Sequence, residues 1–129
     1  MIDNRQSFRL RKQLDVTWSI PDQKIEGEGR IFNISLEGML FTTDKLFVPE
    51  HKLVICFRVA EIPPFPSQGH LTWFSRQRGE EAACYRCGVK FLYEETLRPA
   101  WAKWMEENIL KLADAEDGRI LNRYLTGGD

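Results

Sequence analysis

The chain lacks the features that mark several large classes of protein. Its 129 residues include 18 Lys or Arg and 19 Asp or Glu, so the formal net charge is -1. A general nucleic-acid binder usually shows a strong basic excess, and this balance therefore disfavours a nucleic-acid partner. No apolar run approaches the length that spans a bilayer, and the start of the chain does not have the pattern of a signal peptide. We expect a cytoplasmic protein without a membrane-inserted segment.

Cysteine and histidine are also scarce. Three cysteines, an odd number in a chain without an export signal, favour reduced thiols and no disulfide. Cys84 and Cys87 form a CxxC pair, but Cys56, His51 and His70 do not supply the second pair of ligands that a zinc site needs. The sequence has no phosphate-binding loop, HExxH string or Ser, His and acid combination. We expect no metal site, no cofactor and no enzymatic activity.

What is present favours one domain with a real core. The sequence is 43% hydrophobic and 12% aromatic, and 129 residues leave no room for a second enzyme domain. The distribution of hydrophobic residues divides the single domain, 1–129, into three parts. These are an N-terminal arm at 1–12, a β-barrel at 13–95 and a C-terminal helical segment at 96–125.

Alternating apolar and polar residues predict short strands through the middle part. The segment 14–20 alternates strictly, as a half-buried strand does. Further strands are expected at about 26–34, 39–42, 53–59, 69–76 and 84–93. Turn signals, including the proline cluster at 63–66, separate them. Six short antiparallel strands with this spacing favour a mainly β fold, a small six-stranded barrel.

The two ends of the chain depart from this pattern. Residues 1–12 show no hydrophobic period and are rich in Arg, Asn and Gln, which predicts a flexible arm that orders on binding. After Thr96, a candidate N-cap, the spacing of apolar residues becomes helical. The apolar stripe consists of Leu97, Trp101, Trp104, Met105, Ile109 and Leu112. A second short helix is expected at 120–125, beyond Gly118.

Two short strings carry the strongest functional signal. Arg5 and Arg9 stand four residues apart, so an extended arm presents both guanidinium groups on one side. A planar guanidinium can form a two-pronged contact with a phosphate or with guanine O6 and N7. In the second string, Asn33 and Ser35 share a strand face, and Gly38 allows a turn and close approach of a ligand to the backbone. Together the strings indicate a receptor for a guanine nucleotide.

These patterns, RxxxR followed by (D/N)xSxxG, resemble the signature of PilZ domains, the bacterial receptors for cyclic di-GMP. The segment 85–91, which ends in Gly-Val-Lys-Phe, resembles the closing strand of that family, so the resemblance extends from Arg5 to the end of the chain. It implies a PilZ-like barrel of the split-barrel type, and cyclic di-GMP as the ligand. The residues that it assigns to ligand binding are Arg5, Arg9, Asn33, Ser35 and Gly38.

Trp73 is the remaining candidate. Some PilZ relatives present a tryptophan at this position to a guanine face, and an indole is a stacking platform for any base. Without the resemblance, Trp73 would be assigned to the core, and both roles stay open. Arg5 and Arg9, taken alone, would be solvated arm residues. Asn33, Ser35 and Gly38 also have the chemistry of an ordinary turn, in which Gly38 takes the left-handed position.

The leading hypothesis is a cyclic di-GMP receptor that signals to an unidentified protein partner. Residues 1–12 are loose in the free protein and fold over the ligand in this hypothesis. Arg5 and Arg9 then clamp guanine edges and phosphates, while Asn33 and Ser35 hydrogen-bond a guanine.

Two other hypotheses remain. The first is a PilZ-like adaptor that binds no nucleotide and acts through protein contacts in motility or pilus assembly. The second is a small barrel that binds single-stranded nucleic acid, which the acidic balance disfavours. Many PilZ relatives carry an additional Arg where this chain has Asn4. Arg11 would substitute for that Arg only if the arm bends, so one or two ligands per chain stay open. A monomer or a homodimer also stays open, because the apolar helix stripe can pack on its own barrel or on a second copy.

Overall fold

The computed structural model describes residues 6–45, 47–48, 53–59, 66–78, 83–117, 121 and 124–125. Within these residues the chain forms seven strands. A 3-10 turn, η1 (Pro21–Gln23), follows the first strand, and a short helical segment lies between the sixth and the seventh. The strands are β1 (Gln6–Ile20), β2 (Ile25–Ser35), β3 (Gly38–Thr43), β4 (Leu53–Val59), β5 (Gln68–Arg78), β6 (Ala83–Leu92) and β7 (Ala113–Asp117).

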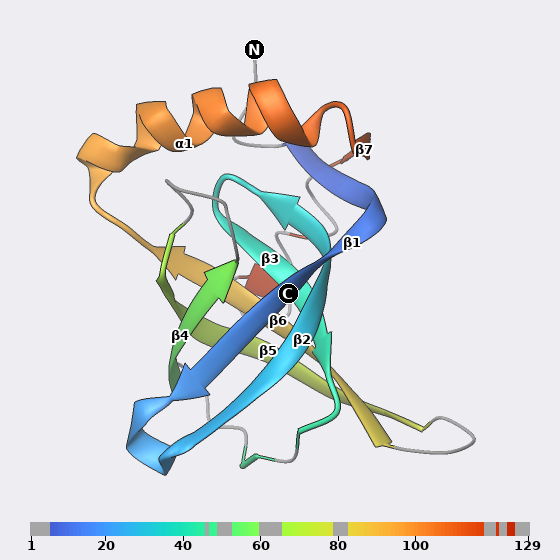
Figure 1. Cartoon of the computed structure of the whole chain (residues 1–129), viewed down its shortest axis with the longest axis vertical. Coiled ribbons are helices and arrows are strands. Elements are labelled where there is room, and N and C mark those ends of the chain that lie inside the picture. The colour runs from blue at the N-terminus through green and yellow to red at the C-terminus, as the bar shows by residue number, and fades with distance from the viewer. Residues whose placement is uncertain are drawn as a thin grey trace.

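Six of the strands close into a ring (Figure 1). The order of neighbours is β2-β3-β6-β5-β4-β1, and β1 pairs back with β2, so every pairing in the ring is antiparallel. Closure satisfies the backbone hydrogen bonds that open sheet edges would leave exposed. The predicted mainly β, six-stranded antiparallel fold is confirmed, and the bounds of β2 to β6 agree with the expected strands to within two residues.

Alternation along the strands builds the core inside the ring. In β4, for example, Leu53, Ile55, Phe57 and Val59 are buried, and the residues between them are half-buried or exposed. Aromatic rings fill the interior, and Phe47 contacts Trp18 with ring centroids 5.3 Å apart. Each fully buried large apolar side chain contributes about 1.5–3 kcal/mol. Period-two burial, which is visible in the sequence, therefore accounts for most of the fold.

The first strand begins inside the segment that was expected to be an arm. Phe8 and Leu10 are 0% and 6% exposed and belong to the core, so the expectation that 6–12 carries no hydrophobic pattern is wrong. The intervening basic residues hide this short alternation in the sequence. The pairing of β1 with β2 shifts register between Arg9 and Leu14. The first half of β1 has β7 as its other neighbour, and the second half has β4.

The helical segment covers one end of the ring (Figure 1). It consists of a 3-10 turn η2 (Glu95–Leu97), helix α1 (Arg98–Trp104) and a π-helical turn η3 (Met105–Ile109). Trp101, Met105 and Ile109 are fully buried, which confirms that part of the predicted apolar stripe. Thr96 lies inside η2 rather than at an N-cap, because α1 begins at Arg98 with a proline in its first turn.

The segment after η3 differs from the prediction. A helical segment was expected over 96–125, but residues 113–117 form strand β7, which pairs with residues 6–10 of β1. The first half of β1 does not pair with β4 and so has an edge with unpaired backbone N–H and C=O groups. Residues 113–117 pair with this edge as a strand. Leu121, Tyr124 and Leu125 are helical, as expected. In the described part of the chain, no helix is both long enough and apolar enough to cross a membrane.

Candidate functional site

The register of the ring aligns three candidate residues. Arg9 of β1 is the register partner of Asn33 of β2, and Asn33 is the partner of Leu40 of β3. Leu40 lies opposite Gly88 of β6, which lies opposite Trp73 of β5. These five residues form one line across five strands, which we call the cross-strand row. Neighbouring strands are about 4.8 Å apart, so the row is about 19 Å long.

The cross-strand row lies on the outer face of the ring. Phe8 and Leu10, the neighbours of Arg9 along β1, point into the core, and alternation therefore directs Arg9 outward. Arg9 is exposed. Trp73, at the other end of the row, packs against a small apolar cluster that includes Leu40 and is separate from the main core. Trp73 is thus an outer-face residue, which resolves the question of whether it lies in the main core.

Ser35 holds the turn between β2 and β3. Its hydroxyl oxygen accepts hydrogen bonds from the backbone N–H groups of Glu37, at 3.1 Å, and of Gly38, at 3.2 Å. Side-chain hydrogen bonds of this kind stabilise turns by replacing backbone partners. Ser35 is 4% exposed, so the structure supports the turn role considered for it in the sequence.

Gly38 is required because β6 comes very close to it. A Cβ atom at this position would overlap the carbonyl oxygen of Val89 and would lie 2.6 Å from Cδ2 of Leu125. The backbone of Gly38 has no positive φ, so the left-handed turn conformation considered for it is wrong. Lack of space for a side chain, rather than backbone freedom, therefore explains this glycine.

Helix α1 fixes the same turn from the outside. The guanidinium of Arg98 donates to the carboxylate of Glu37 at 2.6 Å and to the hydroxyl of Tyr93 at 3.1 Å. Tyr93 and the indole N–H of Trp101 both donate to the carbonyl of Leu36, at 2.9 and 3.3 Å. The hydrogen bond to Glu37 raises the pKa of Arg98, and burial raises the pKa of Tyr93. Both side chains keep the protonated state that the network uses.

Of the two arginines in the RxxxR string, the structure describes one. Arg5 lies outside the described residues, and Arg9 occupies one end of the cross-strand row. Arg11, the nearby arginine considered as a substitute for the residue missing at Asn4, is engaged elsewhere. It donates to the carbonyl of Lys111 at 2.9 Å and lies 3.9 Å from the carboxylate of Asp114.

Two residues near the row were not among the candidates. Ser7 is the register partner of Ser35, and its hydroxyl is buried with no hydrogen-bond partner in the described part of the chain. Arg86 lies two residues from Gly88 along β6, on the same face, with its guanidinium carbon 5.7 Å from the centroid of the Phe32 ring. The two-residue alternation along β6 could have placed Arg86 on the outer face from the sequence, whereas nothing in the sequence singles out Ser7.

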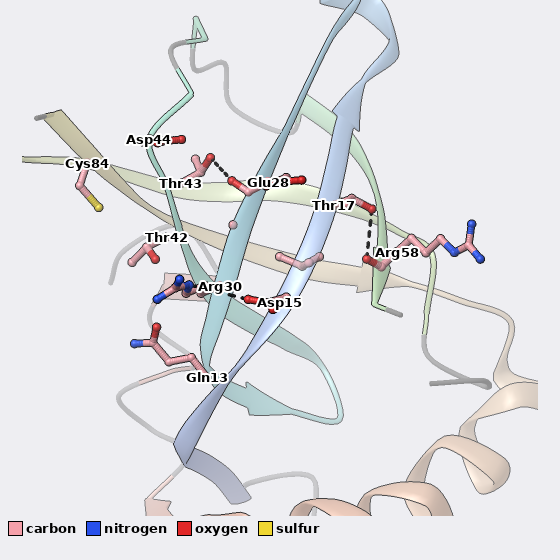
Figure 2. Close-up of a pocket in the computed structure, with 12 residues that line it drawn as sticks. Gln13, Asp15, Thr17, Glu28, Arg30, Thr42, Thr43, Asp44, Arg58 and Cys84 are labelled. Carbon is pink, nitrogen blue, oxygen red and sulfur yellow. Dashed lines mark hydrogen bonds and ion pairs between the residues drawn. The ribbon is translucent and has the colours of Figure 1, made fainter. Parts of the chain in front are cut away.

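Figure 2 shows the residues that line a wide hollow of about 910 Å³. Its lining includes the ion pair of Asp15 and Arg30, at 3.7 Å, and Thr43, which donates to the carbonyl of Glu28 at 2.7 Å. None of the candidate residues lines it. The lining carries three carboxylates, from Asp15, Glu28 and Asp44, and two guanidinium groups, from Arg30 and Arg58, so the hollow offers little to hold an anionic ligand.

The cysteines do not form a site with other ligands. All three thiols are free, and Tyr85, Cys87 and Val89 point into the core, which places Cys84 on the opposite face of β6. Burial raises the pKa of the Cys87 thiol well above its usual range. Among the described residues, no group of three or more His, Cys, Asp or Glu side chains is placed to hold a metal ion.

Comparison with known proteins identifies the family of the chain. No curated protein matches the chain. The family model of the PilZ domain matches residues 3–98, a range that contains both strings, the cross-strand row and the turn held by Ser35. Since this match covers well over half of the 129 residues, the chain belongs to the PilZ domain family.

Proposed function

We propose that this protein is a receptor for cyclic di-GMP, which it holds on the outer face of the ring along the cross-strand row. The observation that carries the proposal is the register itself. Arg9, Asn33 and Trp73 come from distant parts of the sequence, yet they share one row on the outer face of the ring. In the free protein Arg9 is exposed, Trp73 is half-buried and Asn33 is buried. PilZ domains are binding domains, and the proposal includes no catalytic step.

Each residue has a distinct role in this proposal. Arg9 makes a two-pronged contact with a phosphate or a guanine edge, and the amide of Asn33 hydrogen-bonds a guanine. Trp73 stacks on a base, which is worth about 1–3 kcal/mol for such contacts. Ser35 acts through the turn that it closes, and Gly38 keeps β3 and β6 close enough for the ligand to approach the backbone.

Arg5 supplies the second guanidinium in the proposal, although it lies outside the described residues. Because Phe8 and Leu10 are anchored in the core, the segment that folds over the ligand is limited to the residues before Gln6. Hydrogen bonds to charged groups contribute about 1.5–3 kcal/mol each. Several of them reach the roughly 8 kcal/mol that corresponds to micromolar affinity. The altered surface around this segment is then read by a protein partner.

Isothermal titration calorimetry tests the proposal. We expect saturable heat with cyclic di-GMP, no comparable heat with GTP or cyclic di-AMP, and a molar ratio of one or two that gives the stoichiometry. The variant Arg9→Ala should lose binding by at least about tenfold, since it removes a charged, two-pronged contact. Arg58→Ala is the matched control, because Arg58 is also an exposed strand arginine but lies on β4, outside the row. If the wild-type protein gives no heat of binding at high concentrations of cyclic di-GMP, the proposal is overturned.

A PilZ-like adaptor that binds no nucleotide is the second candidate. The observation that favours it is that side chains near the end of the chain already contact the outer face at Trp73. Under this reading, Arg9→Ala leaves partner binding unchanged, and no cyclic dinucleotide changes the thermal stability of the protein.

A further inference from the structure

The end of the chain covers the Trp73 end of the cross-strand row. Leu121 and Leu125 are 2% and 3% exposed, and they form the small outer cluster together with Leu40. Trp73 and Tyr124 pack against this cluster, with ring centroids 4.5 Å apart and ring planes inclined by 48°. A ring at this distance occupies the position that a stacked base needs.

Two further contacts hold this covering segment, which we define as Leu121, Tyr124 and Leu125. The hydroxyl of Thr72 on β5 donates to the carbonyl of Tyr124 at 2.5 Å. The methyl groups of Leu125 fill the space beside Gly38, 2.6 and 2.8 Å from where a Cβ atom would be. The room that a glycine leaves for a ligand at this point is therefore taken by the protein's own leucine.

The Arg9 end of the row is flanked by the same part of the chain. Strand β7 pairs with β1 in a register that places Asp114 opposite Arg9. Residues directly opposite in an antiparallel pair have Cβ atoms about 4.5–5.5 Å apart and project from the same face. Asp114 therefore projects from the same face as Arg9, and its carboxylate lies 3.9 Å from the guanidinium of Arg11.

We infer that the covering segment is an intramolecular competitor for the ligand face, with Tyr124 in the position of a base and Leu125 in the space beside Gly38. The inference rests on the proposed function. A cyclic dinucleotide reaches Trp73 and Gly38 only after the covering segment leaves. Binding therefore releases that segment, and its displacement is a signal that a partner protein can detect.

The covering segment should lower the apparent affinity for the ligand, because it leaves the face open in only a fraction of the molecules. When only a fraction of molecules has the face uncovered, the apparent Kd equals the intrinsic Kd divided by that fraction. Weakening the covering segment therefore tightens binding without changing any residue of the row. The described contacts of the segment are apolar packing with Phe32, Leu40 and Trp73 and one hydrogen bond from Thr72, with no ion pair among them. Such a patch is small enough for a ligand to displace.

The test uses the full chain with the double substitution Tyr124→Ala and Leu125→Ala. We expect this variant to bind cyclic di-GMP at least about tenfold more tightly than the wild type in calorimetry. Leu110→Ala is the matched control, because Leu110 is an exposed leucine in the turn after η3, and its affinity should not change. Circular dichroism verifies that each variant keeps its fold.

A second measurement needs no variant. Hydrogen–deuterium exchange on the wild-type protein, with and without saturating cyclic di-GMP, should show faster exchange in peptides covering 121–125 and unchanged exchange in β4. Equal affinity of wild type and double variant, or unchanged exchange at 121–125 in the ligand complex, would overturn the inference and leave the receptor function intact. Absence of binding by both proteins would remove the receptor function itself.

Discussion

Arg98 donates a hydrogen bond to Glu37 at 2.6 Å, and this contact joins helix α1 to the turn between β2 and β3. The turn carries Ser35 and Gly38 at its two ends. The helix that closes one end of the ring therefore also fixes the candidate site. Disturbing the helix should change ligand binding, although none of its residues lies in the cross-strand row.

Replacing Arg98 by Met should lower both stability and ligand affinity. The side chains of Arg98 and Glu37 are 23% and 35% exposed, so we expect a loss of about 1–2 kcal/mol, at the lower end for hydrogen bonds to charged groups. Urea unfolding gives the free energy of unfolding, and calorimetry gives the affinity. Arg58→Met, on β4, serves as the control and should leave both values within about 0.5 kcal/mol of wild type. Equal stability of the two variants would contradict the anchoring role.

Gly38→Ala should be strongly destabilising. The added methyl group overlaps the carbonyl of Val89, which belongs to the backbone of β6 and cannot rotate away. Overpacking of this kind typically costs about 1–3 kcal/mol. Gly88→Ala provides a comparison, because its nearest neighbours would lie at 3.1 to 3.3 Å and can yield by small shifts. Denaturant midpoints should fall much further for Gly38→Ala, and the reverse order would show that β3 and β6 are less closely packed here.

Ser35 and Ser7 are register partners with opposite expected responses to substitution by alanine. Ser35→Ala removes the two hydrogen bonds that the hydroxyl accepts in the turn and the weaker one that it donates to the carbonyl of Gly38 at 3.4 Å. This loss should cost about 1–2 kcal/mol and weaken ligand binding. The hydroxyl of Ser7 is buried without a partner among the described residues, so Ser7→Ala should be neutral or slightly stabilising. Thermal unfolding of the two variants, side by side, measures the difference. A similar loss in both would mean that the Ser7 hydroxyl has a structural partner.

Thiol labelling should separate the two cysteines of the CxxC pair. The thiolate is the reactive form, and burial both shields Cys87 and raises its pKa, whereas Cys84 is half-buried on the other face. Mass spectrometry after brief treatment of the native protein with iodoacetamide at pH 8 should find Cys84 modified and Cys87 unmodified. Unfolding in urea should make both reactive. Equal labelling in the native protein would contradict the burial of Cys87.

The same thiol gives a pH dependence of stability with a definite sign. In the unfolded chain Cys87 ionises near its ordinary pKa of about 8.5, but in the folded chain the raised pKa keeps it protonated. The unfolded state therefore binds fewer protons above that pH, and the free energy of unfolding falls as the pH rises. Cys87→Ala should reduce this slope between pH 8 and pH 10 in urea unfolding. Identical slopes in wild type and variant would show that Cys87 ionises equally in both states.

The sequence by itself determined the strands that follow a local period. Residues 53–59 form β4 with the predicted bounds, because alternation within seven residues is enough to direct one face to the core. It also determined the two strings that characterise the family, since those are local patterns. Trp101, Met105 and Ile109 were placed on a buried helical stripe for the same reason.

Only the tertiary structure decided which residues meet. The segment 6–12 resembled an arm because its alternation is short and interrupted by basic residues, but pairing with β2 and β7 on its two edges makes it a strand. Residues 113–117 joined β1 for a similar reason, against a helical expectation. The cross-strand row and the contact of Leu125 with Gly38 depend on strand register and chain return. These are long-range relationships, which a local hydrophobic period does not encode.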